Sequence, residues 1–120
     1  MAKLIAIKEN YLFSKVYAKG KKASEKNIAV YALKNYKDGE TRLGITTGKK
    51  LGHAVLRSRA RRLIREAFRL CLRERKFRRA YLIVVVARAP ITDKNRKMAD
   101  VYADLVHAFE KLDLFCEEEN

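Results

Sequence analysis

A row of arginines in the middle of the chain is the strongest chemical signal in the sequence. Arg57, Arg61 and Arg65 follow one another at intervals of four residues, so on a helix they form a line with steps of about 6 Å. Guanidinium groups stay charged and bind phosphate oxygens through paired hydrogen bonds. Only Glu66 and Glu74 could neutralise this row locally. The spacing therefore predicts contact with the phosphates of a nucleic acid rather than a merely solvated helix face.

The charge of the whole chain favours the same kind of partner. The 120 residues carry 28 Lys and Arg against 14 Asp and Glu, a net charge of +14, and the isoelectric point is near 10.0. Residues 42–79 hold 14 of the basic side chains, 11 of them Arg, against two acidic ones, whereas residues 100–120 are acidic. So much positive charge in a small domain is typical of proteins that bind a polyanion, and phosphate backbones are the commonest large one.

A loop with glycines and lysines precedes the arginine row. Gly44 and Gly48 enclose three residues, and Lys49 and Lys50 follow. A nucleotide-binding P-loop needs four enclosed residues and a hydroxyl side chain where Lys50 stands, so the sequence excludes an ATPase of that type. A basic loop just before a helix still suits a phosphate, which makes both lysines candidate contacts to nucleic acid.

Aromatic residues offer a second kind of contact. Phe13 and Tyr17 are four residues apart, so they share one face of a helix, and Tyr31 lies in an apolar stretch typical of a strand. Flat rings beside a basic surface can stack on the bases of a single strand. The same rings are also typical of core packing, which periodicity alone favours, although it leaves stacking open.

The sequence offers no arrangement for catalysis by protein side chains. His53 and His107 are not spaced with acids or cysteines as metal ligands are. Cys71 and Cys116 are too few for a disulfide scaffold or a four-cysteine zinc site, and we interpret them as reduced structural thiols. The longest apolar stretch, 80–87, is far too short to span a membrane, and no segment is typical of a signal peptide. We therefore expect a soluble, cytoplasmic nucleic-acid-binding protein.

The periodicity of apolar residues predicts the elements that position these side chains. Asp38-Gly39 is typical of a hairpin turn, in which the strand after it would pair back on the strand before it. One continuous apolar run, Tyr81–Val86, is typical of an interior strand. The expected helices are 9–19, 54–76 and 94–112, the last capped by Thr92 or Asp93, and the expected strands are 27–33, 42–47 and 81–86, with room for a further strand in the polar connector 21–26.

The segment 54–76 is the clearest of these helices. At about 100° per residue its apolar side chains gather on one arc and its arginines on the opposite arc. The element order α-β-β-α-β-α predicts an α+β fold, an α-β sandwich with helices packed on one small sheet, and leaves room for a parallel strand pair around this helix. With no linker or repeat, residues 1–120 are expected to form one domain, with a short acidic tail at about 113–120. The apolar arc holds Leu56, Ala60, Leu63, Ile64, Ala67, Leu70 and Cys71, and the basic arc holds Arg57, Arg61, Arg62, Arg65, Arg69 and Arg73.

Residues 49–68, KKLGHAVLRSRARRLIREAF, resemble the signature of the protein subunit of bacterial ribonuclease P. That signature is a helix of the form R-N-x-x-K-R-x-x-R-E after a loop of the form K-K-x-G-N-A-V. Ser58 and His53 stand where the signature has asparagines, and Arg61 replaces its first lysine but keeps the charge. The shorter side chain of Ser58 cannot donate two hydrogen bonds as an amide does, so it is not counted among the site residues.

The resemblance extends beyond the signature to roughly residues 8–110. Segments 13–20, 42–45 and 81–88 resemble the family's first helix, its second strand and the strand after the signature helix. The family fold, of the type named after the second domain of a ribosomal protein, has a left-handed βαβ crossover around the signature helix. Periodicity does not indicate that handedness, and most such connections are right-handed.

The resemblance also implies a function. The family protein binds a large catalytic RNA, and the holoenzyme removes 5′ leaders from precursor tRNA by endonucleolytic cleavage. The RNA performs the hydrolysis with magnesium ions, so the protein is expected to supply no catalytic residue and to bind no metal tightly. The implied partners are the catalytic RNA and precursor tRNA, with neither a membrane nor a small-molecule substrate, and the protein itself is expected to be a monomer.

Site residues are carried over by position in the signature and in the segments around it. The implied face for the catalytic RNA consists of Lys49, Lys50, Arg57, Arg59, Arg61, Arg62 and Arg65. The implied cleft for the single-stranded leader is lined or flanked by Phe13, Tyr17, Tyr31 and Arg88.

Two other functions fit the composition. A structural RNA-binding protein of ribosomal type would be equally basic, although it would not explain the signature helix and the segments around it. A DNA-binding regulator could place the arginine helix in a major groove. Against that reading, no short helix precedes residue 57 at the spacing of a helix-turn-helix motif.

Overall fold

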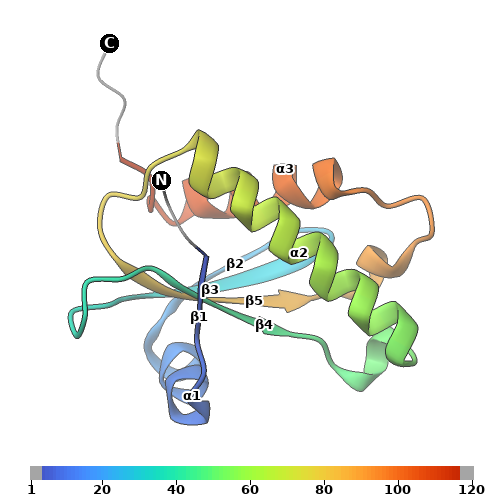
Figure 1. The fold of residues 1–120 in the computed structure, drawn as a ribbon, viewed down its shortest axis with the longest axis horizontal. Coiled ribbons are helices and arrows are strands. Elements are labelled where there is room, and N and C mark those ends of the chain that lie inside the picture. Colours follow the sequence, from blue (N-terminus) through green and yellow to red (C-terminus); the bar gives the residue numbers. More distant parts are fainter. Residues whose placement is uncertain (1–3, 117–120) are drawn as a thin grey trace.

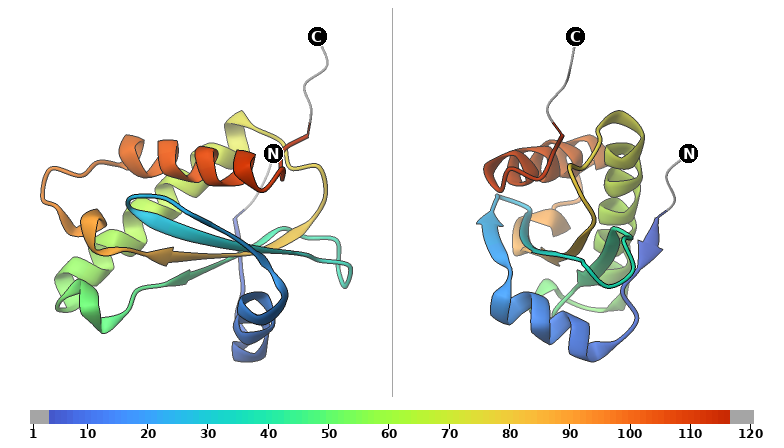
Figure 2. Two further views of the ribbon diagram at one scale, coloured as in Figure 1. Left: turned by 180° about the vertical axis from the view of Figure 1, so that it is seen from behind. Right: turned by 90° about the vertical axis from the view of Figure 1, so that its left-hand side faces the viewer.

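The computed structural model describes residues 4–116, which form one mixed sheet with helices packed on both faces. The strands are β1 (Ile5–Ala6), β2 (Lys21–Ser24), β3 (Ile28–Lys34), β4 (Arg42–Thr46) and β5 (Tyr81–Ala87), and the helices are α1 (Asn10–Lys19), α2 (Ala54–Glu74) and α3 (Met98–Lys111). Short 3-10 turns lie at Lys49–Leu51 and Ala89–Thr92. Figures 1 and 2 show α2 and α3 on one face of the sheet and α1 on the other. The predicted α+β sandwich is confirmed.

The apolar strand β5 takes the centre of the sheet, whose order is β1-β4-β5-β3-β2. Its residues Tyr81–Val85 are all buried, because both faces of this strand are covered by helices and by their side chains. β5 pairs with β3 in antiparallel register along its whole length and with β4 in parallel register. The prediction of an interior strand is confirmed.

The predicted pairing of the two strands around Asp38-Gly39 is wrong. The turn itself forms: Gly39 has a φ of 72°, and the Asn35 side chain donates hydrogen bonds to Asp38 Oδ1 and to the Glu40 carbonyl. However, β3 and β4 are not neighbours, because β5 lies between them. Burying the apolar run of β5 on both faces outweighs the local pairing that the turn alone would favour.

β4, α2 and β5 form the parallel βαβ unit for which the sequence leaves room. Figures 1 and 2 together show a left-handed crossover, as the family resemblance implies. The further strand in the connector 21–26 is present as β2, antiparallel to β3. The short strand β1 pairs with β4 at the sheet edge; it was not predicted, because two residues carry no periodicity.

Two apolar cores hold the helices to the sheet. The larger core lies between the sheet and α2 with α3, and it includes Ile64, Phe68 and Phe109, each at most 1% exposed. The smaller core lies under α1, where Val16 packs with Val84 of β5. Each large apolar side chain buried in this way contributes about 1.5–3 kcal/mol. The buried side of α2 contains most of the predicted apolar arc and adds Phe68 to it.

Several predicted boundaries differ from the structure. α2 ends at Glu74, and α3 begins at Met98 rather than near residue 94. The Asp93 carboxylate does not cap that helix; it accepts a hydrogen bond from the backbone N–H of Asn95 in a separate turn. At the true helix start, Asp100 Oδ2 accepts from the backbone N–H of Lys97.

The two cysteines are both free, but they differ in exposure. Cys71 is buried and Cys116 is exposed, so the prediction of a structural thiol holds only for Cys71. Leu114 and Phe115 are buried, so the core includes the start of the stretch assigned to the acidic tail; residues 117–120 lie outside the described part. No helix within residues 4–116 is both long and apolar enough to cross a membrane.

Candidate nucleic-acid interface

The arginine row lies along a flank of α2 rather than on its most exposed side. Arg57, Arg61 and Arg65 are all half-buried, and the helix separates them by about 6 Å per step. Arg61 donates a hydrogen bond to the side chain of Thr47, just beyond the end of β4. Partial burial restricts the rotamers of each guanidinium, so the row presents its charges in a fixed arrangement.

No carboxylate neutralises the row within residues 4–116. The arginines that form ion pairs there lie elsewhere in the chain: Arg42, Arg75, Arg78 and Arg96. The Nε atom of Arg57 is buried and has no hydrogen-bond partner among the described residues. Because buried donors are normally satisfied, this atom is an exception within the described residues, and the terminal nitrogens of the guanidinium are the groups that could reach a phosphate.

Arg59 has a different environment from the row. Its guanidinium donates to the backbone carbonyls of Asp93, Lys94 and Arg96, in the loop before α3. Hydrogen bonds from a charged donor to three carbonyls hold that loop against α2. The structure therefore gives Arg59 an internal contact that the sequence did not indicate, whereas Arg62 on the same helix is exposed.

The loop before α2 exposes its two lysines. Leu51 is buried and anchors the 3-10 turn, while Lys49 and Lys50 are exposed. Gly52 has a φ of 117°, a conformation that glycine adopts far more readily than other residues. This glycine lets the chain turn directly from Leu51 into α2, which places both lysines at the end of the helix where Arg57 lies.

The structure brings Tyr17 and Tyr31 into contact, and Phe13 packs on the same small core as Tyr31; we call Phe13, Tyr17 and Tyr31 the aromatic cluster. The Tyr17 and Tyr31 rings meet edge to face with centroids 4.9 Å apart. Lys22 Nζ lies 5.4 Å from the centroid of the Tyr31 ring, within the range of a cation–π interaction. Tyr17 is 38% exposed, so its ring is partly accessible to a base.

Phe13 is compatible with both interpretations that the sequence left open, namely core packing and base stacking. It is half-buried and packs against the smaller core. A Cβ atom at Gly44 would lie only 2.6 Å from the Phe13 ring, so the ring rests directly on the backbone of β4. The absence of a side chain at Gly44 is what lets Phe13 sit low on the sheet beside Tyr17.

Two threonines connect the aromatic cluster to the arginine row. Thr46 Oγ1 lies 2.7 Å from the Tyr17 hydroxyl, and the adjacent Thr47 accepts the hydrogen bond from Arg61. Neighbouring residues of an extended chain point to opposite faces of a sheet, so this pair joins the two faces. The sequence analysis missed both threonines and also Lys22; strand alternation was the signal that could have placed Lys22 beside Tyr31.

Arg88 lies on the same face but not in the cluster. It follows β5 and donates a hydrogen bond to the backbone carbonyl of Glu25. The strand residue paired with Tyr31 is Val84, and four strand residues span about 13 Å. Arg88 therefore lies beyond the cluster, at the end of β5, rather than touching the rings.

The turn between β2 and β3, whose Glu25 carbonyl holds Arg88, is bound to α3 by ion pairs. The side chain of Glu25 is 10% exposed, and it lies 2.6 Å from Lys111 Nζ and 3.3 Å from His107 Nδ1. Burial alone would raise the pKa of Glu25, but the adjacent Lys111 and His107 outweigh burial and hold the pKa below its usual 4.5. Asn27 adds two hydrogen bonds to Asp104 Oδ2, both of 2.8 Å.

Neither a metal site nor a reactive thiol lies near this surface. Among residues 4–116, no three His, Cys, Asp or Glu side chains are grouped so as to hold a metal ion. Burial raises the pKa of the Cys71 thiol to about 12, so this thiol stays protonated and unreactive near neutral pH. The side chains that gather on this surface are cations and aromatic rings, which suit binding of phosphates and bases.

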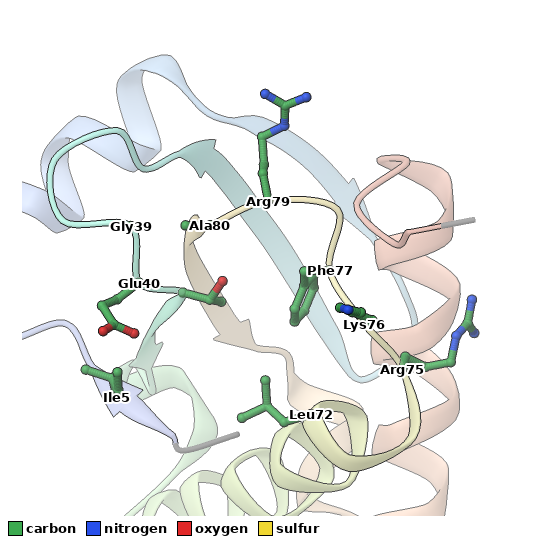
Figure 3. A pocket seen from close by; sticks show the side chains of 10 residues that line it. Ile5, Gly39, Glu40, Leu72, Arg75, Lys76, Phe77, Arg79 and Ala80 are labelled. Atoms are coloured by element: carbon green, nitrogen blue, oxygen red, sulfur yellow. The ribbon is translucent and has the colours of Figure 1, made fainter. Parts of the chain in front are cut away.

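A pocket of about 540 Å³ opens at the other end of α2. Figure 3 shows Ile5, Leu72 and Phe77 around it, with the Arg79 side chain directed away. None of the residues predicted for the interface lines this pocket. It is therefore separate from the arginine row and from the aromatic cluster.

The chain is similar in sequence to ribonuclease P proteins. A family model described as Ribonuclease P matches residues 1–113. The ribonuclease P protein component of Clostridioides difficile is 37% identical over 108 residues, which are 90% of this chain and 91% of that protein. The protein of the same name from Staphylococcus epidermidis is 36% identical over 115 residues, 96% of each.

Solved structures show the same likeness. The RNase P protein of Staphylococcus aureus matches with a TM-score of 0.79 and 32% identity, over 95% of this chain and 100% of that one. The RNase P protein of Thermotoga maritima, 23% identical, matches in fold with a TM-score of 0.70, over 88% of this chain and 94% of that one. The chain therefore belongs to the ribonuclease P protein component family, the protein subunits of the ribonucleoprotein that matures the 5′ end of tRNA.

Proposed function

We propose that the chain serves the ribonuclease P holoenzyme by holding two RNAs at once. One surface binds the catalytic ribonuclease P RNA, and the other holds the single-stranded 5′ leader of precursor tRNA. The proposed contacts to the catalytic RNA are Lys49, Lys50, Arg57, Arg59, Arg61, Arg62 and Arg65. The proposed contacts to the leader are Phe13, Tyr17, Tyr31 and Arg88.

The observation that carries this proposal is the short connection between the two surfaces. Tyr17 and Arg61 are held by the adjacent threonines Thr46 and Thr47. An RNA bound on the arginine row and a strand stacked on the aromatic cluster would thus be connected through two adjacent residues of the chain. Aromatic rings on which bases stack suit a single strand. Guanidiniums, which donate hydrogen bonds to phosphates, suit a folded RNA.

The benefit to the reaction is electrostatic. The catalytic RNA and the precursor are both polyanions and repel each other, and a protein of net charge +14 between them reduces that repulsion. Magnesium ions, bound by the RNA in this magnesium-dependent ribonucleoprotein, supply the hydrolytic chemistry. The protein's own side chains bind and orient the RNAs. We assign the active form to the cytoplasm, with one protein monomer per RNA.

The test is cleavage of precursor tRNA by a bacterial ribonuclease P RNA at low magnesium concentration, with and without this protein. We expect strong stimulation and a cut at the mature 5′ end. Replacing Phe13 and Tyr17 together by Leu keeps apolar volume but removes both rings. Because stacking contributes about 1–3 kcal/mol per base, this variant should bind the precursor about tenfold more weakly or worse.

Two controls separate leader binding from other effects. Leaderless tRNA should bind the wild-type and the Leu variants equally, because it has no strand to stack. Tyr11→Leu removes another exposed tyrosine of α1 and should change neither affinity. Equal losses for precursor and leaderless tRNA would rule out the aromatic cluster as the leader site, and no stimulation of cleavage at all would overturn the proposed function.

A further inference from the structure

A second basic groove lies at the opposite end of the sheet from Arg88. It has a volume of about 530 Å³ and runs between α1, the end of β3 and the segments before β5 and after α3. We call it the lysine groove. Its cationic side chains are Lys15, Lys19, Lys21, Lys34, Arg78 and Arg79. None of these residues belongs to the interface described above.

The groove is strongly positive and largely uncompensated. Six cations face one carboxylate, Asp113, and that carboxylate is already paired with Arg78 at 2.9 Å. Within residues 4–116, the other five cations have no carboxylate at ion-pair distance. All four lysines are exposed. Such a cluster repels itself unless phosphates or other anions occupy it.

The groove also offers a ring and an apolar floor. Tyr36 lines it and is 79% exposed, the largest exposure among the large apolar and aromatic side chains of the described chain. Tyr81 and Leu114 are nearly buried beneath it, and Leu33 is half-buried. A positive groove with an accessible ring is the arrangement by which proteins hold single strands without reading their sequence.

Helix α1 separates this groove from the aromatic cluster. At about 100° per residue, Lys15 and Lys19 lie on the opposite flank of the helix from Phe13 and Tyr17. The C-terminal end of α1 connects the two sides. There Lys22 lies over the Tyr31 ring of the cluster, and the adjacent Lys21 lines the groove. Basic side chains therefore continue from one flank to the other around this end of the helix.

We propose that the lysine groove binds the distal part of the single-stranded 5′ leader, after the strand leaves the aromatic cluster and passes the C-terminal end of α1. This proposal rests on the proposed function of the cluster. β5 sets the order of the sites: Arg88 follows one end of the strand, Tyr81 at the other end borders the groove, and Tyr31 of the cluster pairs with Val84 between them. The three strand residues from Val84 to Tyr81 span about 10 Å. A leader must therefore be long enough to pass the cluster before it reaches the groove.

The test compares two precursor tRNAs bound to the holoenzyme reconstituted from the full chain and a bacterial ribonuclease P RNA. One leader has about 4 nucleotides and the other about 16, the limits of the single-strand site sizes of OB folds. The variant is Lys15→Ala with Lys34→Ala. Its control is Lys8→Ala with Lys76→Ala, which removes the same charge at two exposed lysines outside the groove.

We expect the groove variant to bind the long-leader precursor several-fold more weakly and the short-leader precursor normally. The dependence of log affinity on log salt should become shallower by about 1.4 for the long leader only, since each lost single-strand phosphate contact removes about 0.7. Tyr36→Ala should also weaken only the long-leader complex, and Tyr36→Phe should restore it, because a ring without the hydroxyl still stacks.

Other outcomes are equally informative. Equal losses for both leaders would overturn the proposal, because they would show that the lysines act on assembly of the holoenzyme. No loss in the groove variant, or the same loss in the Lys8/Lys76 control, would also overturn it. The Phe13/Tyr17 variant separates the two claims: if it leaves precursor binding intact, the role of the cluster fails whatever the lysines do.

Discussion

The arginine row of α2 and the lysine groove are both strongly basic, but they are built in opposite ways. Arg57, Arg61 and Arg65 come from one helix and are half-buried, and Arg61 is tied to Thr47. The lysines of the groove come from α1, β2 and β3 and are all exposed. The row presents planar guanidinium donors that are partly held in place. The four lysines of the groove present compact charges on flexible side chains.

This difference shows how a small protein can serve two kinds of RNA. A guanidinium held in place has lost its rotamer freedom before binding, so it favours phosphates in a matching, fixed array such as a folded RNA presents. An exposed lysine keeps that freedom and can follow a strand of any conformation. The comparison implies that geometry matters most on α2 and that charge alone matters most in the groove.

The largest effect is expected from removing the row. Replacing Arg57, Arg61 and Arg65 together by Ala should weaken binding of the catalytic RNA and make its salt dependence shallower by up to about three counterions. Replacing all three by Lys should recover only part of the affinity, since the charge returns without the planar donors. An unchanged slope in a salt titration would contradict the placement of the row on RNA.

A smaller effect should distinguish Arg59 from the row. Its guanidinium holds the loop before α3 through three carbonyls, so Arg59→Ala should lower the free energy of unfolding by about 2 kcal/mol. Urea denaturation measures this loss, and Arg62→Ala on the same helix is the control. Normal stability of Arg59→Ala would show that the three carbonyl contacts do not hold the loop.

The smallest effect concerns the turn that holds Arg88. Because the pKa of Glu25 in the folded protein is held below 4.5, its carboxylate stabilises the fold above that pH, and this contribution is lost as the pH falls through the lowered pKa. Urea denaturation above and below pH 4.5 should show a smaller pH dependence for Glu25→Gln than for the wild type. Equal pH dependence would mean that Lys111 and His107 do not stabilise the ionised form.

The features that could be predicted from the sequence are those that one helix or one strand determines by itself. The row Arg57, Arg61 and Arg65 follows from helical spacing alone, and the run Tyr81–Val86 announces an interior strand because it is apolar on both faces. The resemblance to the family supplied what periodicity cannot, namely the handedness of the crossover and the expectation that Phe13, Tyr17 and Tyr31 belong to one site.

Features that join distant segments were not predictable in this way. The turn at Asp38-Gly39 favours direct pairing of β3 with β4. The two strands are instead separated by β5, because this strand is buried between them. The hydrogen bonds that Arg59 donates depend on the path of the loop before α3, whose carbonyls are 34 to 37 residues further along the chain. The lysine groove likewise assembles from five separate stretches, none of which is unusual by itself.

The position of β5 also has a consequence for how the protein is made. It is the last strand to leave the ribosome, yet it occupies the middle of the sheet. Until Ala87 has been synthesised, β3 and β4 both lack the neighbour that joins them, and such long-range pairing is slow to form. A nascent chain that ends before β5 therefore cannot yet form this sheet. Folding of the sheet has to wait until translation has passed Ala87.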